Sequence, residues 1–111
     1  MKSEDRIRIQ HMLDAAQKAV AFVGNLDFSD FIKDEKLTLS AIRLLEITGE
    51  AAIRVSDDLK EEHHDVPWYQ IAGTRNRLVH GYFDVDLTIV YQIITQDLPP
   101  LITQLQSLLK R

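Results

Sequence analysis

Apolar residues recur at steps of three and four along much of the chain, which is the spacing of amphipathic helices. The first such pattern covers residues 3–24, where Ser3 is the expected N-cap and the acidic Glu4 and Asp5 suit the first helical turn. Gly24 supplies a stop signal. The predicted inward face carries Ile9, Met12, Leu13, Ala16, Ala19, Val20 and Val23.

A second long pattern covers residues 36–59, preceded by a short helix or turn over residues 27–34. Gly49 lies inside the predicted long helix, where glycine costs about 1 kcal/mol relative to alanine. A glycine in this place indicates a close approach between two helices. The inward positions are Phe28, Phe31 and Ile32 in the short segment, and Leu37, Ala41, Leu44, Leu45, Thr48, Ala51, Ala52 and Val55 in the long one.

The remaining patterns predict a third helix over residues 67–82, which starts with Pro67 and ends at Gly81, and a fourth over 87–98. Asp84 or Asp86 caps the fourth helix, and Pro99-Pro100 separates it from a last segment or kinks it. No stretch shows the alternation of a strand. The fold class that we predict is all-α, an up-down bundle of four to five helices that forms a single domain over residues 1–111.

Composition narrows the class of protein. A chain of 111 residues with 45% hydrophobic and 27% charged residues is typical of one globular domain. It has no cysteine, so we expect no disulfide. It has no apolar run near the ~20 residues of a membrane span, so we expect no membrane insertion. Its first segment is charged where a signal peptide would be apolar, and together with the absence of cysteine this predicts a cytoplasmic location. The net charge of -4 argues against broad electrostatic binding of nucleic acid, so any RNA contact must be local or depend on an oligomer.

One segment, "RNRLVHGYFDVD" at residues 75–86, holds more polar groups than a packing helix needs. On a continuous helix Arg75 and His80 would point about 140° apart, whereas Arg77 and His80 could be neighbours. Joint action of Arg75 and His80 therefore requires either that the helix ends near His80 or that a second subunit completes the site.

The residue types in this segment suit phosphodiester chemistry. Histidine can exchange a proton near neutral pH, and arginine stabilises charge that develops on a phosphate. A ribonuclease without a metal needs these two abilities, with His80 acting on the ribose 2'-hydroxyl and Arg75 on the phosphorane-like transition state. Asn76 can fix an oxygen or orient the histidine, and Tyr82 adds a hydroxyl.

The same residues also have structural explanations beside the catalytic one. Arginine, asparagine and histidine at a helix C-terminus also satisfy free carbonyls and favour the helix dipole. The adjacent His63 and His64 point apart on a helix and have no third ligand at a suitable spacing, so we expect no metal site and no cofactor. Glu46, Glu50 and Arg54 are expected to form a solvated or interhelical ion-pair row.

The chain as a whole resembles the HepT-like proteins of the HEPN superfamily. The resemblance is carried by "RNRLVHGY" followed by "FDVDLTIVYQIITQDLP", by "RIRIQHMLDAAQKAVAFV", by "LSAIRLLEITGEAA" and by "VPWYQIAGTRNRLVH". It implies a homodimeric toxin of a type II HEPN/MNT toxin–antitoxin module, with an RNase site formed by Arg75 and His80 in the dimer cleft and with Asn76 and Arg77 in support.

The resemblance also implies a partner, an MntA-like minimal nucleotidyltransferase that acts as the antitoxin. This partner would transfer AMP to Tyr82 and so neutralise the toxin. Two other hypotheses stay open beside the ribonuclease. One is a non-catalytic helical module that binds nucleotide or protein through Arg75 and His80, and the other is a structural dimer whose polar helix end is only capped.

Overall fold

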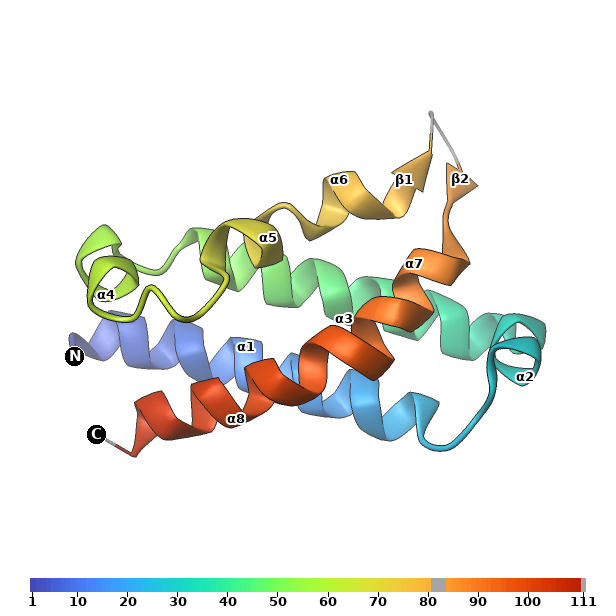
Figure 1. Ribbon diagram of the computed structural model, residues 1–111, viewed down its shortest axis with the longest axis horizontal. Helices are drawn as coiled ribbons and strands as arrows, with labels where there is room; N and C mark the ends of the chain where they lie inside the picture. The colour runs from blue at the N-terminus through green and yellow to red at the C-terminus, as the bar shows by residue number, and fades with distance from the viewer. Residues whose placement is uncertain (81–83, 111) are drawn as a thin grey trace.

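Four helical segments run alternately up and down along the long axis of the protein (Figure 1). The computed structural model describes residues 1–80 and 84–110, and the side chains of Arg75, Val79, His80 and Asp84 lie outside that description. The elements are α1 (Ser3–Val23), α2 (Phe28–Lys33), α3 (Glu35–Ile53), α4 (Asp57–Glu62), α5 (Trp68–Ala72), α6 (Thr74–Leu78), β1 (Val79–His80), β2 (Asp84–Val85), α7 (Leu87–Gln92), the π-helical turn η1 (Ile93–Asp97) and α8 (Leu98–Leu109).

The observed architecture confirms the all-α bundle. The four segments are α1, α3, the pair α5–α6, and the continuous run α7–η1–α8, while α2 and α4 lie at opposite ends of the molecule (Figure 1). Between the third and fourth segments, β1 and β2 form a small antiparallel pair that the sequence did not predict. No helix within the described residues is long and apolar enough to cross a membrane.

The core forms where α1, α3 and the last segment face one another, as the helical apolar pattern predicted. Ile32 is the exception: it was expected to face inward, but its residue is 43% exposed, while Phe31 beside it is fully buried. The helix α2 is short and lies at the end of the bundle, so only one of its faces meets the core. The largest fully buried side chains are Phe31, Ile9, Met12, Leu45, Leu78, Ile94, Leu105, Val23 and Val90.

Gly49 marks a close helix approach, as the sequence predicted. A β-carbon built on Gly49 would lie 3.0 Å from the backbone carbonyl oxygen of Ile71, which is tighter than ordinary van der Waals contact. The missing side chain therefore lets α5 rest directly against α3. The position of α5 matters for the site because α5 leads into α6.

The two long predicted helices end differently from one another. Helix α1 ends at Val23, and Gly24 has the positive φ of 55° that a glycine adopts readily. Its N-cap is Lys2 rather than the predicted Ser3. Helix α3 ends at Ile53 and does not continue to residue 59, because Ser56 caps a separate helix, α4, by accepting a hydrogen bond from the Leu59 amide at 3.3 Å.

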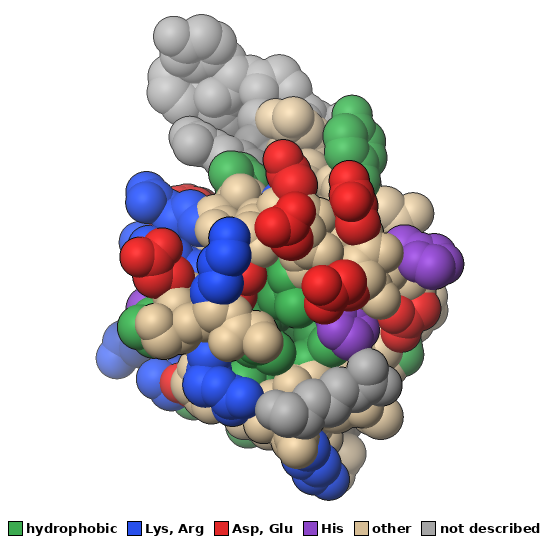
Figure 2. All heavy atoms as spheres, turned by 90° about the vertical axis from the view of Figure 1, so that its left-hand side faces the viewer, with side chains coloured by type: hydrophobic (Ala, Val, Ile, Leu, Met, Phe, Trp, Pro, Cys, Tyr) green, Lys and Arg blue, Asp and Glu red, His purple; other side chains and the backbone are tan. Residues whose placement is uncertain are grey.

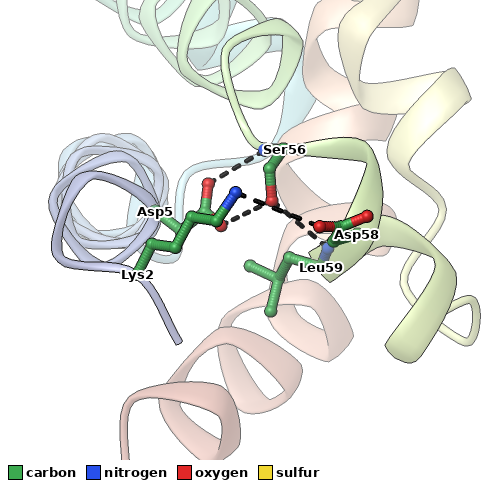
Figure 3. A network of polar contacts seen from close by, with 5 residues as sticks. All are labelled: Lys2, Asp5, Ser56, Asp58 and Leu59. Atoms are coloured by element: carbon green, nitrogen blue, oxygen red, sulfur yellow. Dashed lines mark hydrogen bonds and ion pairs between the residues drawn. The ribbon is translucent and has the colours of Figure 1, made fainter.

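A buried carboxylate connects the start of α1 to this cap (Figure 3). Asp5 is only 5% exposed, and its two oxygens accept hydrogen bonds from the Ser56 amide at 2.9 Å and the Ser56 hydroxyl at 2.6 Å. Burial alone would raise the pKa of Asp5, but the two hydrogen bonds from Ser56, together with the positive charges of Lys2 and the N-terminus, lower it below 3.8. The ionised Asp5 thus ties two helix ends together across 51 positions of sequence.

The third predicted helix, residues 67–82, is broken and shorter in the structure. Pro67 precedes the first helical residue instead of occupying it, Gly73 separates α5 from α6, and α6 ends at Leu78. The predicted stop at Gly81 was therefore too late, and Gly81 itself lies outside the described residues. Of the two candidate caps for the next helix, Asp86 is the one used: its carboxylate accepts from the Thr88 and Ile89 amides at 2.9 and 3.3 Å.

Pro99-Pro100 neither separates nor ends the last helical run. Instead the turn before them widens, and the Leu98 amide donates to the carbonyl of Ile93, five residues back. A proline ring crowds the carbonyl four residues earlier and donates no hydrogen bond, so an α-helical turn would be strained at this point. The wider π-turn η1 accommodates the two prolines, and turns of this kind occur frequently at functional sites.

Candidate functional site

The predicted site residues fall on two consecutive elements. Arg75, Asn76 and Arg77 lie within α6, and His80 is the second residue of β1. Tyr82, the predicted acceptor of AMP, lies outside the described residues. We refer to residues 74–80 and 84–85 as the motif arm. It stands at the opposite end of the bundle from α4 (Figure 1).

Local hydrogen bonds explain why the chain changes direction here. The amides of Asn76 and Arg77 both donate to the carbonyl of Gly73, which starts the short helix α6. Leu78 ends it and is buried, and its carbonyl accepts a 2.7 Å hydrogen bond from the Asp86 amide. In the register of β1 with β2, His80 lies opposite Asp84. The arm is thus held at its base by the buried side chain of Leu78 and a few backbone hydrogen bonds.

The end of α6 changes the geometric argument about Arg75 and His80. Their predicted separation of about 140° holds only on a continuous helix, and the helix ends two residues before His80. Of the two arrangements that would permit joint action, an early helix end is therefore present in the structure. Whether the two side chains converge stays a prediction, because neither of them lies within the described part of the structure.

The two supporting residues of α6 face different hollows. Asn76 is exposed and lines a hollow against α3, together with Glu46 and Glu50. Arg77 lies on the side of η1, where its Nη2 atom is 3.6 Å from Oδ2 of Asp97. The Arg77 and Asp97 side chains are 44% and 55% exposed, so this ion pair is weak. Helix α6 therefore borders two separate hollows.

The larger hollow is a pocket of about 320 Å³ between α5–α6 and the run η1–α8. Its floor reaches Leu45 and Thr48 of α3, and Gln70, Arg77, Gln96 and Asp97 contribute polar groups. No sequence motif marks Gln70, Gln96 or Asp97 as site residues. The sequence feature that could have pointed to this pocket is the pair Pro99-Pro100, since it predicts an irregular backbone beside Asp97.

Acidic side chains gather at the other end of the molecule. Asp57, Asp58, Glu61 and Glu62 of α4 are exposed there, near both chain termini, and the space-filling view of this end shows red side chains grouped over one part of the face, with blue Lys and Arg side chains beside them (Figure 2). An acidic surface repels the phosphates of a nucleic acid. The net negative charge of the protein is therefore concentrated in part away from the motif arm.

The ion-pair row on α3 differs in detail from the prediction. Arg43 contacts Glu46 at 3.5 Å and Glu50 at 3.4 Å, whereas the predicted partner Arg54 forms no ion pair with a described residue. The His63 carbonyl accepts a hydrogen bond from the Trp68 indole at 2.9 Å, which is a structural role. Among the described residues there is no group of three or more metal-ligand side chains.

The chain is similar to known proteins over most of its length. The family model described as "Ribonuclease HepT-like" matches residues 12–108. A protein of Caldanaerobacter subterraneus subsp. tengcongensis named "Putative RNase TTE0752" is 36% identical over 103 residues, which are 93% of this chain and 92% of the relative. A protein of Thermococcus cleftensis named "Probable ribonuclease HepT" is 32% identical over 110 residues, 99% of this chain and 100% of the relative. No solved structure gives a significant match.

The all-α bundle is the fold that the resemblance to the HEPN superfamily implied. Within that superfamily, the chain belongs to the HepT-like ribonuclease family, because the family model and the relatives cover nearly all of it. This confirms the resemblance that the sequence motifs predicted.

Proposed function

We propose that the protein is an endoribonuclease that cleaves RNA without a metal ion, and that it is the toxin of a HEPN/MNT toxin–antitoxin module. The observation that carries the proposal is the placement of Arg75 and His80 on consecutive elements, α6 and β1, in a chain that the family model matches over residues 12–108. The names of two relatives, which describe ribonucleases, support the same activity.

In the proposed reaction His80 accepts the proton of the ribose 2'-hydroxyl. The 2'-oxygen then attacks phosphorus, the bond from phosphorus to the 5'-oxygen breaks, and that oxygen takes a proton from water as it leaves. The protonated His80 then returns its proton to the solvent. Arg75 stabilises the additional negative charge on the phosphate oxygens, which is worth several kcal/mol where donors are held in place. The products are a 2',3'-cyclic phosphate and a free 5'-hydroxyl, so atoms and charge balance without a metal.

A homodimer would complete the site by bringing two copies of the motif arm to one cleft. Doubling Arg75, Arg77 and His80 would give an acidic protein one cationic groove, and it would keep the RNA away from the acidic α4 end. The net charge of -4 and local binding of RNA are then compatible.

The proposed control of the toxin is adenylylation. A minimal nucleotidyltransferase of the MntA type transfers AMP to the Tyr82 hydroxyl, with ATP as the donor and pyrophosphate as the leaving group. The added phosphate is an anion, and we expect it to pair with the cationic Arg75 and Arg77 of the same motif and to occupy the space that RNA needs.

Cleavage is tested with purified protein and single-stranded RNA in the presence of EDTA. We expect His80→Ala and Arg75→Ala each to lower the cleavage rate by a factor of about 10²–10⁴, because a proton carrier or a charge-stabilising group is lost. His64→Ala is the matched control, since His64 is exposed and lies near α4. If both motif variants cleave as fast as the wild type, the ribonuclease site is wrong, and RNA binding without cleavage would favour a non-catalytic module.

Adenylylation is tested by intact-mass measurement after co-expression with the nucleotidyltransferase. We expect added mass in multiples of AMP on the wild type and none on Tyr82→Phe. Tyr69→Phe is the control, because Tyr69 is 92% exposed and would be the acceptor if exposure alone decided the site. Unchanged mass of the wild type, or equal modification of Tyr82→Phe, would remove this part of the proposal.

A further inference from the structure

The pocket between α5–α6 and η1–α8 has no part in the chemistry proposed for Arg75 and His80, yet it borders the same helix. Arg77 stands at its rim, two residues from Arg75 on α6. Asp97 faces Arg77 across the opening from η1. A ligand group bound in this pocket would therefore lie close to a phosphate held by the motif arm.

Two side-chain amides in this pocket are available to a ligand. Gln70 and Gln96 are exposed, line opposite walls, and make no side-chain hydrogen bond to another described residue. Gln104 differs from them, because its amide already donates to the Asp65 carbonyl at 3.0 Å and closes one end of the pocket. A side-chain amide has N–H donors and a carbonyl acceptor, so Gln70 and Gln96 can hydrogen-bond to a ligand edge that carries both donors and acceptors.

The floor and remaining walls are largely apolar. Leu45, Ile71, Ile93, Leu98 and Leu101 line them, and Pro67 and Pro100 stand at the edges. The two threonine hydroxyls on the floor already donate to helix carbonyls, Thr48 to Leu44 at 2.8 Å and Thr74 to Gln70 at 3.3 Å. The pocket thus offers apolar contact in its depth and hydrogen bonding at its sides.

A nucleobase has the matching chemistry, with two apolar faces and an edge of donors and acceptors. Proteins that bind single-stranded RNA commonly insert such unstacked bases into pockets and hydrogen-bond their edges. A volume of about 320 Å³ lies at the lower end of the range for ligand sites, roughly 300–1,000 Å³. Arg77 at the rim adds a cation for the phosphate attached to the base, although it must first leave Asp97.

We propose that this pocket binds one unpaired nucleobase through Gln70 and Gln96, with the attached phosphate at Arg77. The assignment rests on the proposed ribonuclease function for its biological meaning, since a base held here would fix the position of the RNA strand relative to Arg75. Such a base has two sources: a nucleotide of the RNA substrate, or the adenosine that the antitoxin would transfer.

Binding is tested without cleavage, by NMR titration of the protein with AMP, GMP, CMP and UMP. We expect the side-chain amide signals of Gln70 and Gln96 to shift, and the double variant Gln70→Ala/Gln96→Ala to raise the Kd about ten-fold, the loss expected for two hydrogen bonds. Gln106→Ala is the matched control, because Gln106 is exposed on α8 and does not line the pocket. Ribose 5-phosphate, which lacks a base, should bind more weakly than each mononucleotide that shifts these signals.

Equal binding of ribose 5-phosphate and the mononucleotides would overturn the proposal, as would unchanged affinity in the double variant. This assay contains no cleavage step, so its result does not depend on His80. If the wild type binds mononucleotides but does not cleave RNA, and the glutamine double variant does not bind them, the proposed ribonuclease activity is refuted while the nucleobase site is supported.

The two sources are then distinguished by competition. Displacement of the bound mononucleotide by a single-stranded RNA oligonucleotide, together with a raised KM and little change in kcat for the double variant, assigns the pocket to RNA. If added AMP no longer shifts the Gln70 and Gln96 signals in protein that is already adenylylated, and RNA does not displace the mononucleotide from unmodified protein, the pocket is assigned to the transferred adenosine. Both results support a nucleobase site.

Discussion

The helical body and the motif arm are built on different principles. In the body, α1, α3 and α8 bury large apolar side chains from distant parts of the sequence, and Asp5 adds a buried polar connection to Ser56. In the arm, the buried side chains of α6 among the described ones are Leu78 and the small Thr74, while Asn76 and Arg77 are exposed. Stability and the proposed chemistry therefore reside in different residues, and substitutions in the two regions should have different effects.

The largest loss of stability is expected in the body. Leu105→Ala removes a fully buried side chain from α8, and we expect the free energy of unfolding to fall by about 2–5 kcal/mol, since both transfer energy and a cavity contribute. Urea denaturation followed by circular dichroism measures this change. Leu39→Ala is the matched control, because that leucine is 58% exposed and should cost little. Equal losses in the two variants would contradict the proposed core.

The connection between Asp5 and Ser56 should make the body sensitive to acid. The pKa of Asp5 is lower in the folded protein than its ordinary 3.8, so its contribution is complete well above that pH and is lost as the pH falls through the folded pKa. We expect Asp5→Asn to lower the free energy of unfolding at pH 7 by about 1.5–3 kcal/mol, as for hydrogen bonds to a charged group. The difference from the wild type should shrink below pH 4.

Asp58→Asn serves as the control for Asp5→Asn. Asp58 is exposed and only 3.9 Å from Lys2, so its removal should leave the acid dependence nearly unchanged. Denaturant titrations at several pH values provide the measurement. A difference between wild type and Asp5→Asn that stays constant from neutral to acidic pH would show that the carboxylate charge is not what stabilises this junction.

The smallest effect is expected in the arm, at the ion pair between Arg77 and Asp97. A double-mutant cycle with Arg77→Ala and Asp97→Ala should give a coupling energy of about 0.2–1 kcal/mol, because both side chains are half-exposed. The same Arg77→Ala variant should raise the KM for RNA if Arg77 contacts a phosphate. A coupling of several kcal/mol would mean that the arm is held as firmly as the body, and the contrast between the two regions would fail.

Most of the body was predictable from sequence because its helices follow their own apolar patterns. The end of α1 at Gly24 and the close approach at Gly49 are local signals, and both are present in the structure. The end of α3 was not predictable in this way. The apolar pattern continues to Val55, but Ser56 caps α4 and bonds to Asp5, a contact across 51 positions. A single domain over residues 1–111 stays a prediction.

The candidate site was predictable only in part. The spacing of Arg75 and His80, together with the residues that flank it and the patterns along the rest of the chain, pointed to the family, and the family is confirmed. The roles of these residues and of Tyr82 stay predictions. The break at Gly73 was missed because a lone glycine is tolerated within a helical pattern. The pocket was missed because its walls come from α3, α5, α6, η1 and α8, and no local pattern reports which side chains those segments bring together.

The π-turn η1 has a consequence for how the last helical run connects the two regions. Such a turn holds one residue more than an α-helical turn, so deleting a single residue within 93–97 would restore an uninterrupted α-helix. Every position before the deletion would then rotate by about 100° relative to α8. Asp86 and β2 would swing away from Leu78, so a single-codon deletion here would misdirect the arm while leaving each helix intact on its own.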